Sequence, residues 1–288
     1  MNAIQTQTLD PNFLNSLADQ IVARMTAVGP TESITFGELY HQYFERHVKI
    51  RLKNQDNPHY FFKVYGARWA AVKVHELKRT ELQAWIDTVG QKSASAATRA
   101  LNMVKAIINW GMRKDLIPRM VNPCSGVETF ECRSRERFVL PAELNRLRAA
   151  LDEEPNLMRD FFWISLLTGA RRSNVLSMRW DEIDFDLATW MIPADKFKNG
   201  NSHTIPICAL ALGILQRRFE NREVTSPWVF PGRKANDHLK EPKRAWKRII
   251  TRAEITDLHI HDLRRTLGSY MAMNGENQYV IAQMLGHK

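Results

Sequence analysis

Arginine and histidine recur in three short motifs of the second half of the chain, and the first motif ends at Arg171. In Thr168-Gly169-Ala170-Arg171, an apolar run stops at a glycine and the arginine precedes the expected start of the next helix. A guanidinium beside a helix N-terminus favours an anion, because the free amide groups and the helix dipole add to its positive charge. By itself, this motif fits equally an arginine that pairs with a local carboxylate.

The second motif is His261-Asp262-Leu263-Arg264, in which the imidazole and the guanidinium are three residues apart. That spacing places both side chains on one face of a helix. Two such donors can grip one phosphate, and a histidine can also move a proton near neutral pH. A metal site built from His259, His261 and Asp262 is the competing interpretation, and the lack of a further acidic or histidine cluster nearby disfavours it.

The third motif, Leu285-Gly286-His287, follows a predicted helix over residues 278–285. A histidine just after a glycine stop can act as a third phosphate donor. As an isolated feature it is more often a histidine that ends a helix.

Two predicted helices carry basic rows. The row over residues 243–252 holds five cations in ten residues, namely Lys243, Arg244, Lys247, Arg248 and Arg252. Its opposite face is apolar, so one side is expected to pack while the other contacts phosphate. On the helix predicted over Ser95–Arg113, Lys105, Asn109 and Arg113 recur every fourth residue. This second row fits a phosphate contact and a solvated helix face equally well.

Composition favours a nucleic-acid partner. The 288 residues carry a formal net charge of +10, and 44% of them are hydrophobic, enough for folded cores. A protein this basic, with a pI near 9.6, usually meets a polyanion. The three cysteines, Cys124, Cys132 and Cys208, form neither a zinc pattern nor a disulfide framework. We expect a cytoplasmic protein, because no apolar run is long enough to span a membrane.

Four segments are expected along the chain. Residues 1–33 hold one helix, residues 34–122 form an all-helical block, residues 123–138 link two domains, and residues 139–288 mix helices with a few strands. In the linker, Arg133 and Arg135 belong to an alternating basic stretch that can lie along a DNA backbone. The strands are expected between Trp180 and Pro206, on either side of the polar turn Lys198-Asn199-Gly200.

The ordered set of motifs resembles the tyrosine recombinase, or phage integrase, family. That family carries an arginine after a Thr-Gly pair, then His-x-x-Arg, then Leu-Gly-His, and Arg171, His261 with Arg264, and His287 meet this pattern here. The resemblance implies a two-domain, mainly α fold. Residues 34–122 would be an all-α, SAM-like core-binding domain, and residues 139–288 an α+β DNA breaking-rejoining catalytic domain with a small antiparallel sheet.

The resemblance also implies a mechanism. A tyrosine attacks a DNA phosphodiester and forms a 3′-phosphotyrosyl bond, which conserves the bond energy without ATP, metal or cofactor. Arg171, Arg264 and His287 would stabilise the charge on the phosphate, each donor contributing roughly 3–4 kcal/mol. Lys198 would protonate the leaving oxygen, with Lys196 and Lys240 as alternatives, and His261 would assist the tyrosine.

The chain departs from the family pattern at two places. The family's tyrosine is expected about ten residues after the Leu-Gly-His motif, whereas Tyr270 and Tyr279 precede it and the sequence ends at Lys288. We therefore expect a truncated polypeptide that does not itself cleave DNA. Asn174 stands where many relatives carry an acidic residue, and an amide cannot stabilise a charged His261 as a carboxylate would.

The implied partner is double-stranded DNA with a specific recombination site, in the cytoplasm of a prokaryote and at its nucleoid. Members of the family act as tetramers on paired sites, whereas we expect this chain to be monomeric in solution. A catalytically inactive DNA-binding regulator with the same fold and a type IB topoisomerase are the alternative functions. The compact helical N-terminal domain favours a recombinase over a topoisomerase.

Overall fold

The computed structural model describes residues 34–52, 55–132, 135–197, 200–234 and 236–286. The predicted helix within residues 1–33 lies outside these ranges. The chain divides into two compact units, Met1–Ser134 and Arg135–Lys288, and each unit has its own hydrophobic core.

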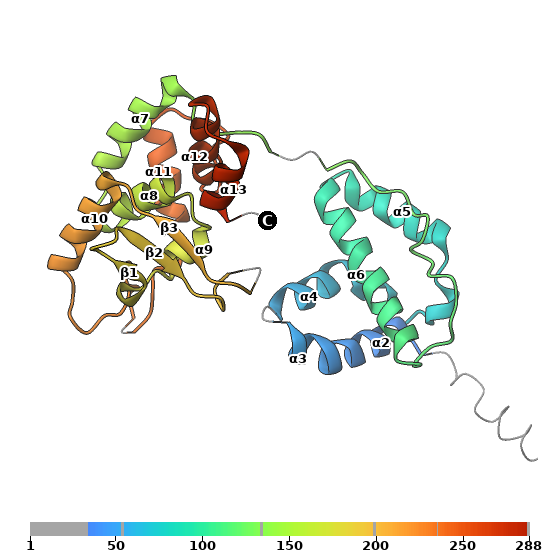
Figure 1. The fold of residues 1–288 in the computed structure, drawn as a ribbon. Coiled ribbons are helices and arrows are strands. Elements are labelled where there is room, and N and C mark those ends of the chain that lie inside the picture. Colours follow the sequence, from blue (N-terminus) through green and yellow to red (C-terminus); the bar gives the residue numbers. More distant parts are fainter. Residues whose placement is uncertain (1–33, 53–54, 133–134, 198–199, 235, 287–288) are drawn as a thin grey trace, which may run out of the picture. The chain divides into compact units, whose positions relative to one another are not determined.

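The regular elements in the described part of the first unit are all helices, joined by loops (Figure 1). The first helix in its described part, α2, begins at a capping box. The hydroxyl of Thr35 accepts from the amide of Glu38, and the carboxylate of Glu38 accepts from the amide of Thr35. The helices of this unit are α2 (Phe36–Tyr43), α3 (Lys49–Arg51), α4 (Asp56–Phe61), α5 (Arg79–Gly90) and α6 (Ala94–Arg113), joined in places by single π or 3₁₀ turns.

Helix α6 is the longest helix of the first unit and follows the sequence pattern closely. Ser93 caps it by accepting from the amide of Ala96, and the predicted inner face, Ala97, Leu101, Val104 and Ile108, is buried. α6 packs against α5 and α2, and the aromatic side chains of Trp85 and Tyr40 complete the core. The prediction of an all-helical block is confirmed for the described residues.

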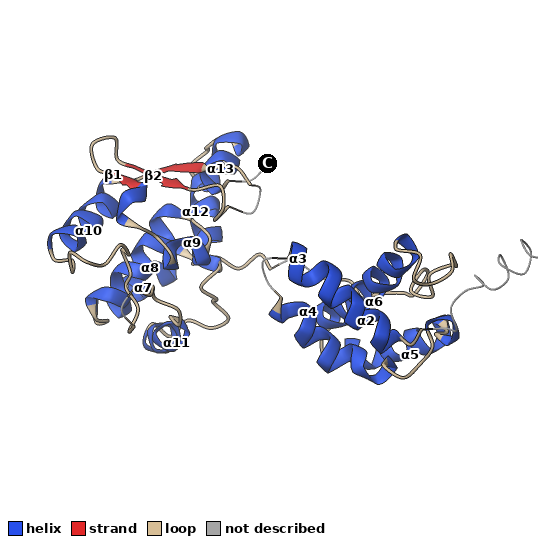
Figure 2. Cartoon of the chain, turned by 90° about the horizontal axis from the view of Figure 1, so that it is seen from below, coloured by secondary structure: helices blue, strands red, loops and turns tan. Residues whose placement is uncertain are grey.

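The second unit places a small sheet on one side of a group of helices (Figures 1 and 2). The strands β1 (Ile183–Asp184), β2 (Thr189–Ile192) and β3 (His203–Pro206) are antiparallel, in the order β1-β2-β3, and Trp190 of β2 faces Ile205 of β3. Trp190, Ile192 and Ile205 are buried against the helices. The helices are α7 (Pro141–Asp152), α8 (Asn156–Thr168), α9 (Arg172–Leu176), α10 (Ala209–Glu220), α11 (Lys243–Arg252), α12 (Asp262–Met273) and α13 (Gln278–Leu285).

Two glycines with positive φ end the helices that meet at the site described below. Gly169 ends α8 at φ 58°, and Gly286 ends α13 at φ 65°. A Cβ atom at Gly169 would lie 2.8 Å from Leu267 of α12 and 2.9 Å from Leu285 of α13, so only glycine lets the end of α8 approach these two helices.

The mainly helical architecture with its small antiparallel sheet confirms the predicted fold class. No helix in the described part of the chain is long and apolar enough to cross a membrane.

Candidate active site

Arg171 is held at the break between α8 and α9. It is the N-cap residue of α9, with an extended backbone at φ −62° and ψ 138°. The guanidinium carbon lies 4.5 Å from the ring centroid of Phe197. Its Nη1 atom is buried and has no hydrogen-bond partner among the described residues. Because an unsatisfied buried donor is costly, this nitrogen fits a site that accepts an anionic ligand.

Arg264 of α12 is 7% exposed and joins the ends of two other helices. It donates from Nη1 to the carbonyl of Gly169, at 2.7 Å, and from Nη2 to the carbonyl of Leu285. Burial, followed by the nearby charge of Arg171, lowers the pKa of Arg264 to about 10. The guanidinium of Arg264 therefore stays charged at neutral pH, and an anion bound beside it would relieve the repulsion from Arg171.

His261 immediately precedes α12 and is exposed at the surface of the unit. Partial burial of the ring and the charges of Arg265 and Arg264 lower the pKa of His261, against the opposite effect of Asp262. A histidine with a lowered pKa is neutral at pH 7, so its free nitrogen can accept a proton.

His203 is a site residue that the sequence analysis missed. Its Nε2 atom lies 3.3 Å from the carbonyl of Met284, and its ring lies against Phe197 with centroids 4.9 Å apart. Because a carbonyl only accepts, Nε2 must carry the proton. Burial, together with the charges of Arg264 and Arg171, lowers the pKa of His203. The two-residue repeat of β3 could have indicated this histidine, because His203 lies on the same face of the strand as the buried Ile205.

Lys198 and His287, two of the predicted catalytic residues, lie outside the described residues. Their neighbours Phe197 and Gly286 are in contact, because a Cβ atom on Gly286 would clash with the Phe197 ring and lie 3.1 Å from Nε2 of His203. The end of α13 therefore packs against the side chain of Phe197.

The two alternative lysines are already engaged. Lys196 donates to the carbonyl of Ser177 at 2.7 Å and pairs with the buried carboxylate of Glu182. Lys240 pairs with Asp237 at 2.7 Å. These contacts leave Lys198 as the favoured lysine for the acid role.

Asp262 and Asn174 are both buried near the site. The carboxylate of Asp262 is fully buried and accepts from Arg135, Arg265 and the amide of His259, so its oxygens are not disposed to bind a metal. Among the described residues, no group of three or more histidine, cysteine or carboxylate side chains is placed to hold a metal ion. Asn174 is 3% exposed on α9, and its Nδ2 atom has no partner in the described part of the chain.

The basic row of α11 divides into two groups. Lys243, Arg244 and Lys247 are exposed. Arg248 instead pairs with the buried Glu154 at 2.7 Å, and Arg252 binds Glu153 at 2.9 Å and the carbonyl of Ala150 at 2.8 Å. Arg248 and Arg252 thus fasten α11 to the end of α7. These ion pairs compete with phosphate for the two arginines, and their assignment to DNA binding stays a prediction.

In the first unit, Lys105 and Arg113 of α6 are exposed, whereas Asn109 accepts from Nδ2 of Asn122 at 2.8 Å. Asn109 therefore holds the segment that follows α6. Arg133 lies outside the described residues. Arg135, which was predicted to lie along DNA, pairs within the second unit with Asp257 at 3.0 Å and with Asp262 at 3.2 Å, and its contact with DNA stays a prediction.

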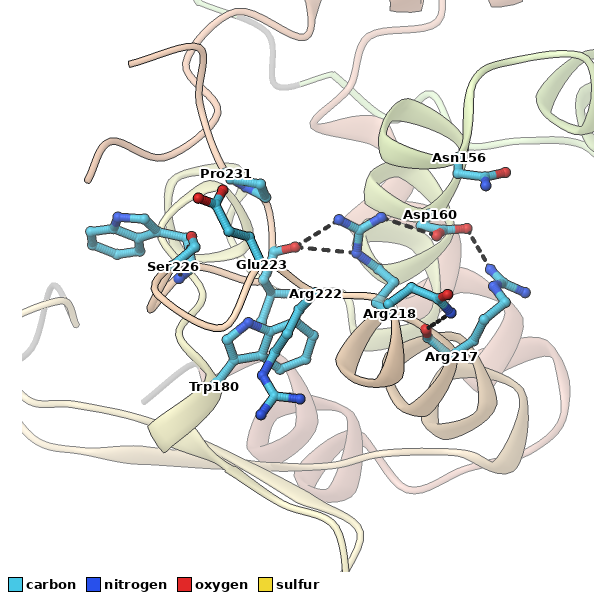
Figure 3. Close-up of a pocket in the computed structure, with 12 residues that line it drawn as sticks. Asn156, Asp160, Trp180, Arg217, Arg218, Arg222, Glu223, Ser226 and Pro231 are labelled. Carbon is cyan, nitrogen blue, oxygen red and sulfur yellow. Dashed lines mark hydrogen bonds and ion pairs between the residues drawn. The ribbon is translucent and has the colours of Figure 1, made fainter. Parts of the chain in front are cut away.

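A hollow of about 350 Å³ lies at the other end of α8 from Gly169 (Figure 3). Arg217 and Arg218 line it, but both pair with the buried Asp160, at 2.8 Å and 3.2 Å. Arg218 also donates twice to the carbonyl of Val229. These arginines tie α10 to α8, which makes the hollow a structural junction rather than an anion site.

The second unit identifies the class of protein. Residues 137–288 match the phage integrase family, and the chain belongs to that family. It is 25% identical over 229 residues to the prophage integrase IntF of Escherichia coli K12, covering 74% of this chain and 47% of that protein. It is 26% identical over 210 residues to the integrase of Salmonella phage P22, covering 68% and 52%. The chain spans about half the length of these curated relatives.

Solved structures share the fold. The integrase of transposon Tn1549, in complex with a circular intermediate DNA, matches with a TM-score of 0.74 and 15% identity over 88% of this chain and 92% of that chain. A lambda integrase dimer bound to a core site matches with a TM-score of 0.71 and 16% identity, covering 88% and 95%.

Proposed function

We propose that this chain is the DNA-binding and phosphate-binding body of a site-specific DNA recombinase. The reaction would break and rejoin DNA through a 3′-phosphotyrosyl intermediate without a metal or cofactor. The observation that carries the proposal is the meeting of Arg171 and Arg264, from helices far apart in the sequence, with one buried guanidinium nitrogen left unsatisfied.

The arginine pair supplies a preorganised anion site. Arg264 is fixed by the carbonyls of Gly169 and Leu285, so its side chain does not have to reorganise when a phosphate binds. Nη1 of Arg171 is buried without a hydrogen-bond partner in the described residues, and its guanidinium lies over Phe197, which contacts Gly286 at the end of α13. Charge that grows on the phosphate oxygens in the transition state would then be stabilised by two fixed cations, with His287 as a further donor.

Proton transfer is proposed for two other groups. His261, with its lowered pKa, takes the proton of the attacking tyrosine or orients it, and Lys198 protonates the leaving 5′-oxygen. Neither tyrosine near the third motif fits the nucleophile. The hydroxyl of Tyr270 is buried, and Tyr279 is 70% exposed on α13. The proposal therefore assigns the nucleophile to neither of these two tyrosines.

Double-stranded DNA is the proposed partner. Lys243, Arg244 and Lys247 of α11 and Lys105 and Arg113 of α6 are the exposed cations best suited to phosphate contacts. The similar lambda integrase has been captured as a tetramer on a Holliday junction. We propose a tetramer on DNA for the intact protein and a monomer in solution for this chain, which light scattering would check. The bacterial and phage relatives favour the prokaryotic nucleoid as the place of action.

Orthovanadate, a tetrahedral analogue of phosphate, provides the test. Titration by ⁵¹V NMR should show binding to the 288-residue chain and roughly 100-fold weaker binding to the R171Q variant. The variant R148A, which removes an exposed arginine from α7, is the charge-matched control and should bind as the parent does. A protein that binds DNA but shows no arginine-dependent vanadate binding would be a regulator without the phosphoryl-transfer site.

A further inference from the structure

The carboxylate of Asp262 is the most heavily engaged buried charge near the site. It is fully buried at the first turn of α12. Its Oδ1 accepts from Arg265 at 2.6 Å, and its Oδ2 accepts from Arg135 at 3.2 Å and from the amide of His259 at 2.8 Å. Three donors and two cations offset the cost of burying this charge, which lowers the pKa of Asp262 below its usual range.

Arg135 is where the chain enters the second unit. Besides Asp262, its guanidinium donates to the carboxylate of Asp257 at 3.0 Å and to the carbonyl of Asp257 at 2.8 Å. One planar guanidinium therefore joins the entering segment both to the loop before α12 and to the buried carboxylate at its start.

The residues after Arg135 continue along the same helix. The amide of Val139 donates to the hydroxyl of Thr266 at 2.9 Å, and that hydroxyl donates to the carbonyl of Asp262 at 2.8 Å. The ring of Phe138 meets the ring of Tyr270 edge-on at 6.5 Å between centroids. Contacts at Asp262, Thr266 and Tyr270 recur every fourth residue, so the segment runs along one face of α12.

The same helix carries the proposed phosphate ligands. Arg264 lies two residues after Asp262 and spans the carbonyls of Gly169 and Leu285, while His261 immediately precedes the carboxylate. A helix is rigid over one or two turns, so any shift of its entering segment is passed to Arg264 and His261.

We infer that Asp262 and Arg135 form a positioning latch, in which the segment that enters the second unit fastens α12 so that Arg264 is held in its phosphate-binding position. This inference deepens the proposed function and rests on it for the role of Arg264. It assigns Arg135 to the control of the site rather than to contact with DNA. It also means that tension or release on the segment before Val139 changes the affinity of the site for phosphate.

The test compares R135A and R135K with the control R148A in the whole chain. Hydrogen exchange is followed by mass spectrometry in peptides that cover residues 259–268, and peptides of α8 serve as the internal reference for global stability. R135A should speed exchange in residues 259–268 roughly tenfold relative to α8, because a charge-assisted contact at the first turn is lost. R135K, which retains one charged contact to Asp262, should restore most of the protection.

Orthovanadate affinity by ⁵¹V NMR is the second readout. R135A should weaken vanadate binding several-fold, R135K should recover most of it, and R148A should leave it unchanged. Exchange in residues 259–268 that is unchanged in R135A, or that rises only in parallel with α8, overturns the latch. If the parent chain itself binds no vanadate, the proposed function fails, and the exchange result alone still decides whether the latch exists.

Discussion

Arg171 and Arg264 look equivalent in the sequence, but they differ in their hydrogen bonds in the structure. Arg264 is bound by two backbone carbonyls, whereas Nη1 of Arg171 has no partner in the described residues. A substitution at Arg264 should therefore affect both stability and ligand binding, whereas a substitution at Arg171 should affect ligand binding alone. Sites often keep an energetically costly unsatisfied group because function needs it.

The first prediction uses this difference. R264Q should lower the free energy of unfolding by about 3 kcal/mol, because two charge-assisted bonds between helix ends are lost. R171Q should leave the unfolding free energy unchanged or raise it, since it removes a buried donor without a partner. Both variants should lose vanadate binding. Urea titration followed by circular dichroism checks the stabilities, and a large destabilisation in R171Q would contradict the assignment.

The second prediction concerns acid stability through His203 and His261. The pKa of each is lowered from its ordinary value of 6.5, mainly by burial and by neighbouring arginines. Below pH 6.5 these two histidines are protonated in the unfolded chain but still largely neutral in the folded chain. The free energy of unfolding therefore falls as the pH drops towards the lowered pKa values. The Tm from calorimetry should therefore decline between pH 7 and pH 5.

H203Q is the matched variant, because its side-chain amide can still donate to the carbonyl of Met284 but does not titrate in this range. Its Tm should decline less steeply over the same interval. H203F keeps the ring against Phe197 and loses the donor, which should cost about 1 kcal/mol at every pH. If the Tm of the parent and that of H203Q fell equally with pH, His203 would not contribute to the pH dependence.

Among the secondary-structure elements, α11 shows most clearly that a basic face need not be free for DNA. Lys247 is exposed, but Arg248 pairs with a carboxylate of Glu154 that is only 1% exposed. Removing either cation changes the net charge equally, so differences between the two variants report on their contacts.

The third prediction follows from this pair. K247A should reduce the slope of log Kd against log salt by about 0.9 and leave the Tm unchanged, as expected for loss of one phosphate contact. R248A should lower the Tm, because Glu154 is left buried with Arg252 alone. Its salt slope should change little. Fluorescence anisotropy on duplex DNA and calorimetry separate the two effects, and a K247A slope equal to that of the parent would refute the DNA assignment.

The elements that could be predicted from the sequence are those determined by residues close together in the chain. The periodicity over Ala94–Arg113 and the glycine stops at Gly169 and Gly286 defined helices and their ends. Long-range partners were not predictable: Arg248 pairs with a residue 94 positions away, Arg135 with one 127 positions away, and His203 with one 81 positions away. The spacing of a row of cations in the sequence does not show which carboxylates pair with it, so the ion pairs of Arg135, Arg248 and Arg252 were not predicted.

The whole molecule comprises two units, and each has its own core. Phe36, Trp85 and Ile108 centre the first core, and Phe161 and Trp190 centre the second. Cores that do not share residues are expected to fold independently. The proposed anion site is built from residues of the second unit, whereas exposed cations suited to DNA occur in both units.

The last prediction therefore separates phosphate binding from DNA affinity. A fragment of residues 135–288 should fold, bind orthovanadate as the whole chain does, and bind duplex DNA with a shallower salt slope. The whole chain should add about 0.9 to that slope for each phosphate that Lys105, Arg113 or another cation of the first unit contacts. Anisotropy over a range of salt concentrations measures both slopes. If the fragment matches the whole chain in slope and affinity, the first unit contributes no phosphate contact, and DNA binding belongs to the second unit alone.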